Sequence, residues 1–134
     1  MTAKGQFDYS TDDRTLAGKV EEGVPVMDVV AFGRSSGFTL DELAKLLRIP
    51  PRTYARRVAT KTRLKIGESD RAVRIMRLFD RARRVFGTQA RTRQWLHRPL
   101  RVLGGRTPLD FAQTEPGARE VEAVLDRFED GTFS

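Results

Sequence analysis

The chain has 134 residues and a formal net charge of +7, with 25 Lys and Arg against 18 Asp and Glu. It contains no cysteine, which excludes a disulfide framework and a Cys-ligated metal site. No apolar run approaches the roughly 18 residues that a membrane-spanning helix requires. The N-terminus has no apolar signal core, so we expect a cytoplasmic protein.

The charge is divided along the chain into three blocks. Residues 48–106 hold 18 Lys and Arg and only 3 Asp and Glu, residues 1–47 hold 5 against 8, and residues 107–134 hold 2 against 7. A basic middle block favours a polyanionic partner, because each phosphate that it neutralises releases counterions. The alternative is an ordinary solvated surface. The acidic C-terminal block indicates a second partner of different chemistry.

The first part of the chain changes from a polar segment to helical periodicity. Residues 1–17 are polar, and we predict a poorly ordered leader there. A first helix is predicted to begin near Pro25, followed by a Ser/Gly-rich break over residues 33–37. No later segment alternates apolar and polar residues over a length that predicts a strand, so we expect an all-α fold.

The clearest helix start in the sequence is Thr39, which is a favourable N-cap for a helix over residues 40–47. Glu42 stands three residues further on and completes a capping box, while Phe38 and Leu43 form the pair of a hydrophobic staple. Such a cap typically contributes about 1 kcal/mol.

Further helix boundaries follow from caps and prolines. Pro51 suits the first position of a helix, Gly87 suits a C-cap, and Thr88 and Thr107 suit N-caps. The remaining helices are predicted over residues 52–61, 69–86, 88–97, 107–114 and 116–129.

Residues 40–58 read LDELAKLLRIPPRTYARRV, which is typical of a helix-turn-helix. Ala44 supplies the small residue where the two helices meet, whereas Arg48 stands in the turn where a glycine is usual. Arg side chains on the second helix read guanine edges and hold phosphates. The predicted DNA-binding residues are Arg52, Thr53, Arg56, Arg57 and Lys61. An ordinary helical hairpin with a polar outer face is the alternative.

Several other features carry no catalytic chemistry. The chain has one histidine, His97, and no pair of carboxylates in an apolar setting, so we expect no enzyme, no metal site and no cofactor. The arginines of residues 71–84 form either a second phosphate-contacting surface or a solvated helix face, since Asp80 lies one turn from Arg77 and Arg84.

The C-terminal helix combines acidic residues with an apolar stripe at helical spacing. Such a helix is not expected to contact DNA. It either covers the protein's own core or inserts into a groove of a partner, and the composition leaves both open.

Three segments together resemble a known family. They read IPPRTYARR, ESDRAVRIMRLFDRARRVFG and WLHRPLRVLGGRTPLDFAQTEPGAREVEAVLDRFEDGTFS, and over roughly residues 20–134 they closely resemble the Xre/MbcA/ParS family of antitoxins. The most specific stretch is GGRTPLDFAQTEPGAREVEAVLDRFEDG. Its Gly-Gly turn, its Thr-Pro helix start, and Gly117, Val121 and Gly131 fall in the family's order.

The resemblance implies an antitoxin of a type II toxin–antitoxin system. After the leader over residues 1–17, it implies an Xre-like helix-turn-helix domain for DNA binding and dimerisation over residues 18–87, and a small helical toxin-binding domain over residues 88–134. The N-terminal part would bind the promoter of its own operon as an autorepressor, and the homodimer would belong to a larger toxin–antitoxin complex.

The family's usual partner is a RES-domain toxin, which consumes NAD or transfers its ADP-ribosyl part. The resemblance implies that the C-terminal region, within residues 105–134, covers the toxin's active-site cleft. An acidic segment in a dinucleotide cleft can meet the basic groups that hold the NAD phosphates. The predicted toxin-binding residues are Glu120, Val124, Arg127, Phe128, Asp130, Gly131 and Phe133.

Two other classes of function compete with this interpretation. A stand-alone helix-turn-helix transcriptional regulator without a toxin partner would need residues 107–134 only for its own folding or dimerisation. An RNA-associated protein is disfavoured, because the sequence shows no aromatic stacking platform.

Overall fold

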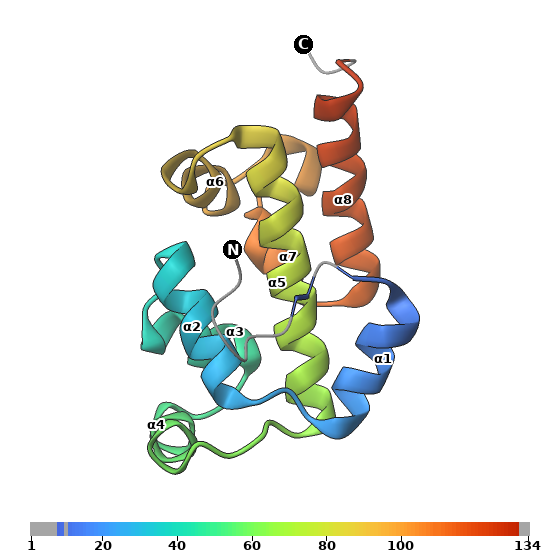
Figure 1. Ribbon diagram of the computed structural model, residues 1–134. Coiled ribbons are helices and arrows are strands. Elements are labelled where there is room, and N and C mark those ends of the chain that lie inside the picture. Colours follow the sequence, from blue (N-terminus) through green and yellow to red (C-terminus); the bar gives the residue numbers. More distant parts are fainter. Residues whose placement is uncertain (1–7, 10, 132–134) are drawn as a thin grey trace. The chain divides into compact units, whose positions relative to one another are not determined.

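A computed structural model describes residues 8–9 and 11–131 of the chain (Figure 1). In this part the regular elements are all helices and there is no strand, only two isolated β-bridges, Pro25–Arg63 and Leu100–Arg106. The all-α prediction is therefore confirmed. The chain separates into two compact units, Met1–Met76 and Arg77–Ser134, which are described in turn.

The elements are α1 (Asp13–Glu22), α2 (Val26–Ser36), α3 (Leu40–Leu47), α4 (Pro51–Thr60), α5 (Ile66–Phe86), α6 (Gln89–Leu96), the 3-10 helix η1 (Arg101–Leu103), α7 (Pro108–Phe111) and α8 (Glu115–Glu129). The boundary between the two units lies within α5.

The first unit is built around three mutually packed helices, α2, α3 and α4. Val29, Leu47 and Tyr54, one from each helix, are almost completely buried in its core. Burial of such side chains typically contributes about 1.5–3 kcal/mol each, which makes this packing the main support of the unit.

The N-terminal segment is more ordered than the sequence analysis predicted. Residues 13–17 of the expected leader belong to α1, whose N-cap Asp12 accepts a hydrogen bond from the backbone N–H of Thr15 at 3.0 Å. Leu16 is buried, and the Tyr9 hydroxyl donates to an Asp28 carboxylate oxygen at 2.7 Å. The cap and these tertiary contacts hold a segment whose composition alone predicts disorder. The other residues of that leader, 1–7 and 10, lie outside the described residues.

The predicted break over residues 33–37 is also wrong, because α2 continues to Ser36. It ends at Gly37, which has a φ of +82°. Gly33 is a packing residue inside the helix: a Cβ there would lie 2.6 Å from Leu43 Cδ1 of α3. The glycine allows α2 and α3 to approach each other closely, which sequence periodicity does not reveal.

The predicted N-caps are confirmed. The hydroxyl oxygens of Thr39, Thr88 and Thr107 each accept a hydrogen bond from the backbone N–H three residues further on, at 3.0–3.2 Å. A fourth such cap, Thr114, was not predicted; it starts α8 by accepting from the Gly117 N–H at 3.1 Å.

The second unit has its own core between the C-terminal part of α5 and helices α6, α7 and α8. Phe86, Trp95 and Phe128 form an aromatic cluster with ring centroids 5.1–6.2 Å apart. Leu96 and Leu125 of the same unit are completely buried. Aromatic pairs at these distances add about 0.5–1.5 kcal/mol to the burial of their surface.

Candidate functional surfaces

Helices α3 and α4 form a helix-turn-helix despite the arginine in the turn. Arg48 adopts a left-handed conformation with φ 58° and ψ 43°, and the next residue, Ile49, donates its N–H to the Ala44 oxygen at 2.9 Å. A left-handed non-glycine residue costs roughly 1–2 kcal/mol. The buried Ile49 and the turn hydrogen bonds hold Arg48 in the conformation that glycine usually supplies.

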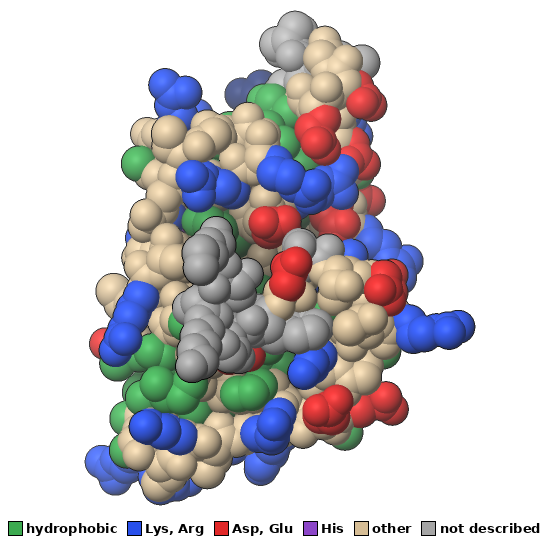
Figure 2. Space-filling view, in the orientation of Figure 1, with side chains coloured by type: hydrophobic (Ala, Val, Ile, Leu, Met, Phe, Trp, Pro, Cys, Tyr) green, Lys and Arg blue, Asp and Glu red, His purple; other side chains and the backbone are tan. Residues whose placement is uncertain are grey.

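The outer face of α4 carries most of the predicted DNA-binding residues. Arg52, Arg56 and Lys61 are exposed, and Thr53 is half-buried next to Arg52. In Figure 2, Lys and Arg side chains border the lower edge of the view, where Figure 1 places α4. The buried Tyr54 fixes the opposite face of the helix to the core, so that the basic face is turned to solvent.

Arg57 differs from the other predicted DNA-binding residues. Its guanidinium forms an ion pair with the Glu68 carboxylate of α5. The same carboxylate accepts the backbone N–H of Lys65 at 2.9 Å. Arg57 therefore links α4 to the first turn of α5, a contact that the sequence analysis missed.

A short antiparallel contact holds the segment that follows α4. The Val26 N–H donates to the Thr62 oxygen at 3.1 Å, and the Leu64 N–H donates to the Val24 oxygen at 2.8 Å. At Gly23 a Cβ would lie 2.6 Å from the Leu64 oxygen, and φ is +92°. Only glycine suits this position. The close approach and the two hydrogen bonds together fix the C-terminal end of α4 relative to α2.

The arginines along α5 make contacts within the protein. Arg71 donates to the Leu47 oxygen at 2.8 Å, and Arg74 and Arg84 pair with the carboxylates four residues before them, Asp70 and Asp80. These contacts favour the structural interpretation of this stripe over a second phosphate-contacting surface.

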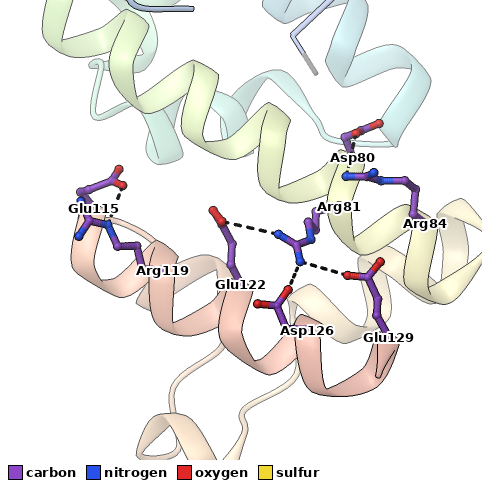
Figure 3. A network of polar contacts seen from close by, with 8 residues as sticks. All are labelled: Asp80, Arg81, Arg84, Glu115, Arg119, Glu122, Asp126 and Glu129. Atoms are coloured by element: carbon purple, nitrogen blue, oxygen red, sulfur yellow. Dashed lines mark hydrogen bonds and ion pairs between the residues drawn. The ribbon is translucent and has the colours of Figure 1, made fainter. Parts of the chain in front are cut away.

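One arginine organises the acidic face of α8 (Figure 3). Arg81 of α5 forms ion pairs with Asp126, with Glu129 at 3.1 Å and with Glu122 at 4.0 Å. The three carboxylates follow helical spacing along one side of α8. The acidic residues of α8 are therefore partly neutralised by Arg81 inside the unit. Figure 2 shows acidic side chains along α8.

The predicted toxin-binding residues divide into two groups. Those at the surface of α8 and just after it are Glu120, Arg127, Asp130 and Gly131. Val124 is only 2% exposed, and Phe128 is half-buried against Phe86 and Trp95. Phe133 lies outside the described residues.

Val124 and Phe128 line a groove of about 510 Å³, which we call the α6–α8 groove. Its lining residues are Trp95, Arg98, Leu100, Arg101, Val102, Val124 and Phe128. Val102 is 54% exposed. The groove was not predicted from the sequence.

Two features are absent from the described residues. No helix there is long and apolar enough to cross a membrane, and no group of three or more His, Cys, Asp or Glu side chains there is arranged to hold a metal ion.

Comparison with known proteins assigns both units. Residues 15–77 match the antitoxin Xre-like helix-turn-helix domain, and residues 81–131 match the antitoxin Xre/MbcA/ParS C-terminal toxin-binding domain. A DNA-binding motif followed by a toxin-binding domain defines a regulator of the toxin–antitoxin class, and its relatives are non-enzymatic.

Three relatives carry the description Antitoxin Xre. The protein of Photorhabdus laumondii subsp. laumondii is 34% identical over 116 residues, which cover 86% of this chain and 78% of that protein. The protein of Yersinia enterocolitica is 35% identical over 94 residues (69% and 64%), and that of Pseudomonas putida is 32% identical over 83 residues (62% and 52%). The chain belongs to the Xre/MbcA/ParS family of antitoxins.

Proposed function

We propose that this antitoxin neutralises a RES-domain toxin, which consumes NAD or transfers its ADP-ribosyl part, and that it represses the promoter of its own operon. The observation that carries the proposal is the agreement between two domain matches and two surfaces of different charge. Residues 15–77 present the basic face of α4, and residues 81–131 present the acidic α8. The RES assignment rests on the resemblance of the C-terminal sequence.

On the DNA side, α4 acts as the recognition helix of a homodimer in the cytoplasm. Arg52 and Arg56 are the exposed side chains suited to base edges and phosphates, and Lys61 suits a phosphate contact. A dimer of such motifs binds half-sites about 34–36 Å apart, one turn of DNA. The expected operator is therefore an inverted repeat of that spacing.

On the toxin side, the end of α8 enters the active-site cleft. Glu120 and Asp130 are exposed carboxylates of α8 and its C-cap that lie outside the Arg81 ion pairs. They suit the basic groups that hold NAD phosphates in such a cleft. The antitoxin then blocks the cleft without performing chemistry. In this proposal the chain divides into a DNA-binding and dimerisation domain and a toxin-binding domain.

Co-expression tests the proposal. The chain, tagged at its N-terminus, is co-expressed with the product of the neighbouring gene in its operon, and the purified material is weighed by native mass spectrometry. The expected result is a stable complex in which NAD consumption or ADP-ribosyl transfer by the partner is abolished. Recovery of the chain as a lone dimer that binds its upstream DNA would instead support a stand-alone transcriptional regulator.

A further inference from the structure

The α6–α8 groove is an apolar depression whose rim is cationic. Five of its seven lining residues are apolar, and the other two are Arg98 and Arg101. Both arginines are exposed. Among the described residues neither side chain has a hydrogen-bond or ion-pair partner, unlike Arg84 and Arg106, which pair with Asp80 and Asp110.

The sequence around these two arginines also lacks acidic residues. Residues 81–109 contain no Asp or Glu, although they contain eight arginines. Arg98 and Arg101 therefore have no carboxylate near them in the sequence, although Val124 and Phe128 on the other side of the groove belong to the acidic α8. Both exposed guanidinium groups are therefore available to a carboxylate of a partner.

The chemistry of the groove defines what fits it. The groove offers an apolar surface formed by Trp95, Val102 and Phe128. This surface suits a bulky aliphatic or aromatic side chain, which is the usual anchor at protein interfaces. Guanidinium groups at the rim bind carboxylates through charge-assisted hydrogen bonds. A nucleic acid backbone would suit the arginines but would leave the apolar surface without an apolar partner.

We propose that the α6–α8 groove binds a segment of the toxin in which one bulky apolar side chain is flanked by Asp or Glu. The proposal rests on the proposed function, because it requires a toxin partner, but it does not depend on the toxin's reaction. It places a second contact beside the acidic end of α8. The antitoxin then offers carboxylates to basic groups of the toxin and receives an acidic, apolar segment from it.

Trp95 allows occupancy of the groove to be measured directly, because it is the only tryptophan in the chain. The full-length antitoxin labelled with 5-fluorotryptophan gives a single ¹⁹F resonance, even when the unlabelled toxin contains tryptophans. The purified protein encoded beside this chain is the probe. Its addition is expected to shift the ¹⁹F resonance, and the same concentration of operator duplex alone is expected to leave it unchanged.

Three variants test the groove by affinity. Val102→Glu and the double variant Arg98→Glu/Arg101→Glu are expected to weaken toxin binding at least about tenfold, since anchor residues dominate interface energies. Both changes are at exposed side chains, and circular dichroism checks that the variants fold. The control is Arg91→Glu, an exposed arginine of α6 outside the groove, which is expected to stay within about twofold of the wild type.

Several results would overturn the proposal. The first result combines two observations. The groove variants fold and bind the toxin with wild-type affinity, and the ¹⁹F resonance of the labelled antitoxin does not shift when the toxin is added. The second is a resonance that shifts with operator DNA alone, which would make the groove a polyanion site. The third is a groove variant that changes only the oligomeric state of the free antitoxin, which would place a second copy in the groove. If the wild-type antitoxin captures no toxin, the proposed function itself is wrong. Toxin capture by the wild type therefore distinguishes failure of the proposed function from failure of the groove proposal.

Discussion

The Arg57 guanidinium and the Glu68 carboxylate form an ion pair between α4 and the first turn of α5, and their side chains are only 14% and 13% exposed. Glu68 also accepts a hydrogen bond from the Lys65 N–H. A single carboxylate therefore bonds a backbone N–H at the start of α5 and forms the ion pair with α4. Arg57 consequently has a structural partner that the neighbouring Arg56 lacks. The two arginines of one motif are expected to behave differently when they are replaced.

Arg57→Ala is expected to lower the free energy of unfolding by about 1–2 kcal/mol, because it leaves Glu68 without its charged partner. Arg56→Ala is expected to change that free energy by less than about 0.5 kcal/mol. It should weaken operator binding, and if Arg56 contacts a phosphate it should reduce the salt slope by about 1. Urea denaturation and DNA titrations at several salt concentrations measure both effects. An Arg57→Ala variant of wild-type stability that no longer binds DNA would contradict this assignment.

Gly117→Ala is expected to destabilise the second unit by more than about 2 kcal/mol. A Cβ at Gly117 would overlap the backbone oxygen of Phe111, and a backbone atom of α7 cannot move aside as a flexible side chain can. The matched control is Gly18→Ala in α1, where a Cβ meets nothing within 4 Å. That change is expected to be neutral or to stabilise by up to about 1 kcal/mol, the usual difference in helix propensity. Equal denaturation midpoints for the two variants would refute the prediction.

Tyr54→Phe is expected to be neutral or slightly stabilising, because the Tyr54 hydroxyl is buried without a hydrogen-bond partner among the described residues. The contrasting change is Tyr9→Phe, which removes the hydrogen bond to Asp28 and is expected to cost about 1 kcal/mol. Chemical denaturation at neutral pH compares the two. A loss of stability for Tyr54→Phe as large as that for Tyr9→Phe would indicate an unseen partner for Tyr54.

Tyr54 also makes the stability of the fold depend on pH in the alkaline range. Burial raises the pKa of Tyr54 from 10.0 to about 12, because desolvation disfavours the phenolate. Between pH 10 and 12 the unfolded chain loses this proton while the folded chain keeps it, so stability falls as the pH rises through that range. Tyr54→Phe is expected to reduce this slope, measured as unfolding free energy against pH. An unchanged slope would show that the Tyr54 phenol does not contribute.

Charge reversal on α8 should separate toxin contacts from internal ones. Glu120→Lys is expected to weaken toxin binding and leave the unfolding free energy nearly unchanged, since Glu120 is exposed and outside the Arg81 ion pairs. Asp126→Lys places a cation against Arg81 and is expected to lower both stability and affinity. Isothermal titration with the toxin and thermal denaturation give the two readouts. Unchanged affinity for Glu120→Lys would remove the idea that the acidic face of α8 meets basic groups of the toxin.

The sequence by itself determined the features that depend on residues three or four positions apart. The threonine caps at Thr39, Thr88 and Thr107 bond the N–H groups three residues on, and the helical periodicity of the apolar residues reports one buried face. These interactions are complete within one turn of helix, so composition and spacing are enough to predict them. The resemblance added the family, which the comparisons confirm.

Only the tertiary structure decided the contacts between residues that are distant along the chain. The burial of Leu16, the close approach of Gly33 to Leu43, and the ion pair between Arg57 and Glu68 each depend on how one helix packs against another. The α6–α8 groove depends on the same kind of packing, since its walls come from segments more than 20 residues apart. A side chain's periodicity shows that it faces a neighbour but does not show which one, because the loops and the volumes of all the packed residues determine that choice together.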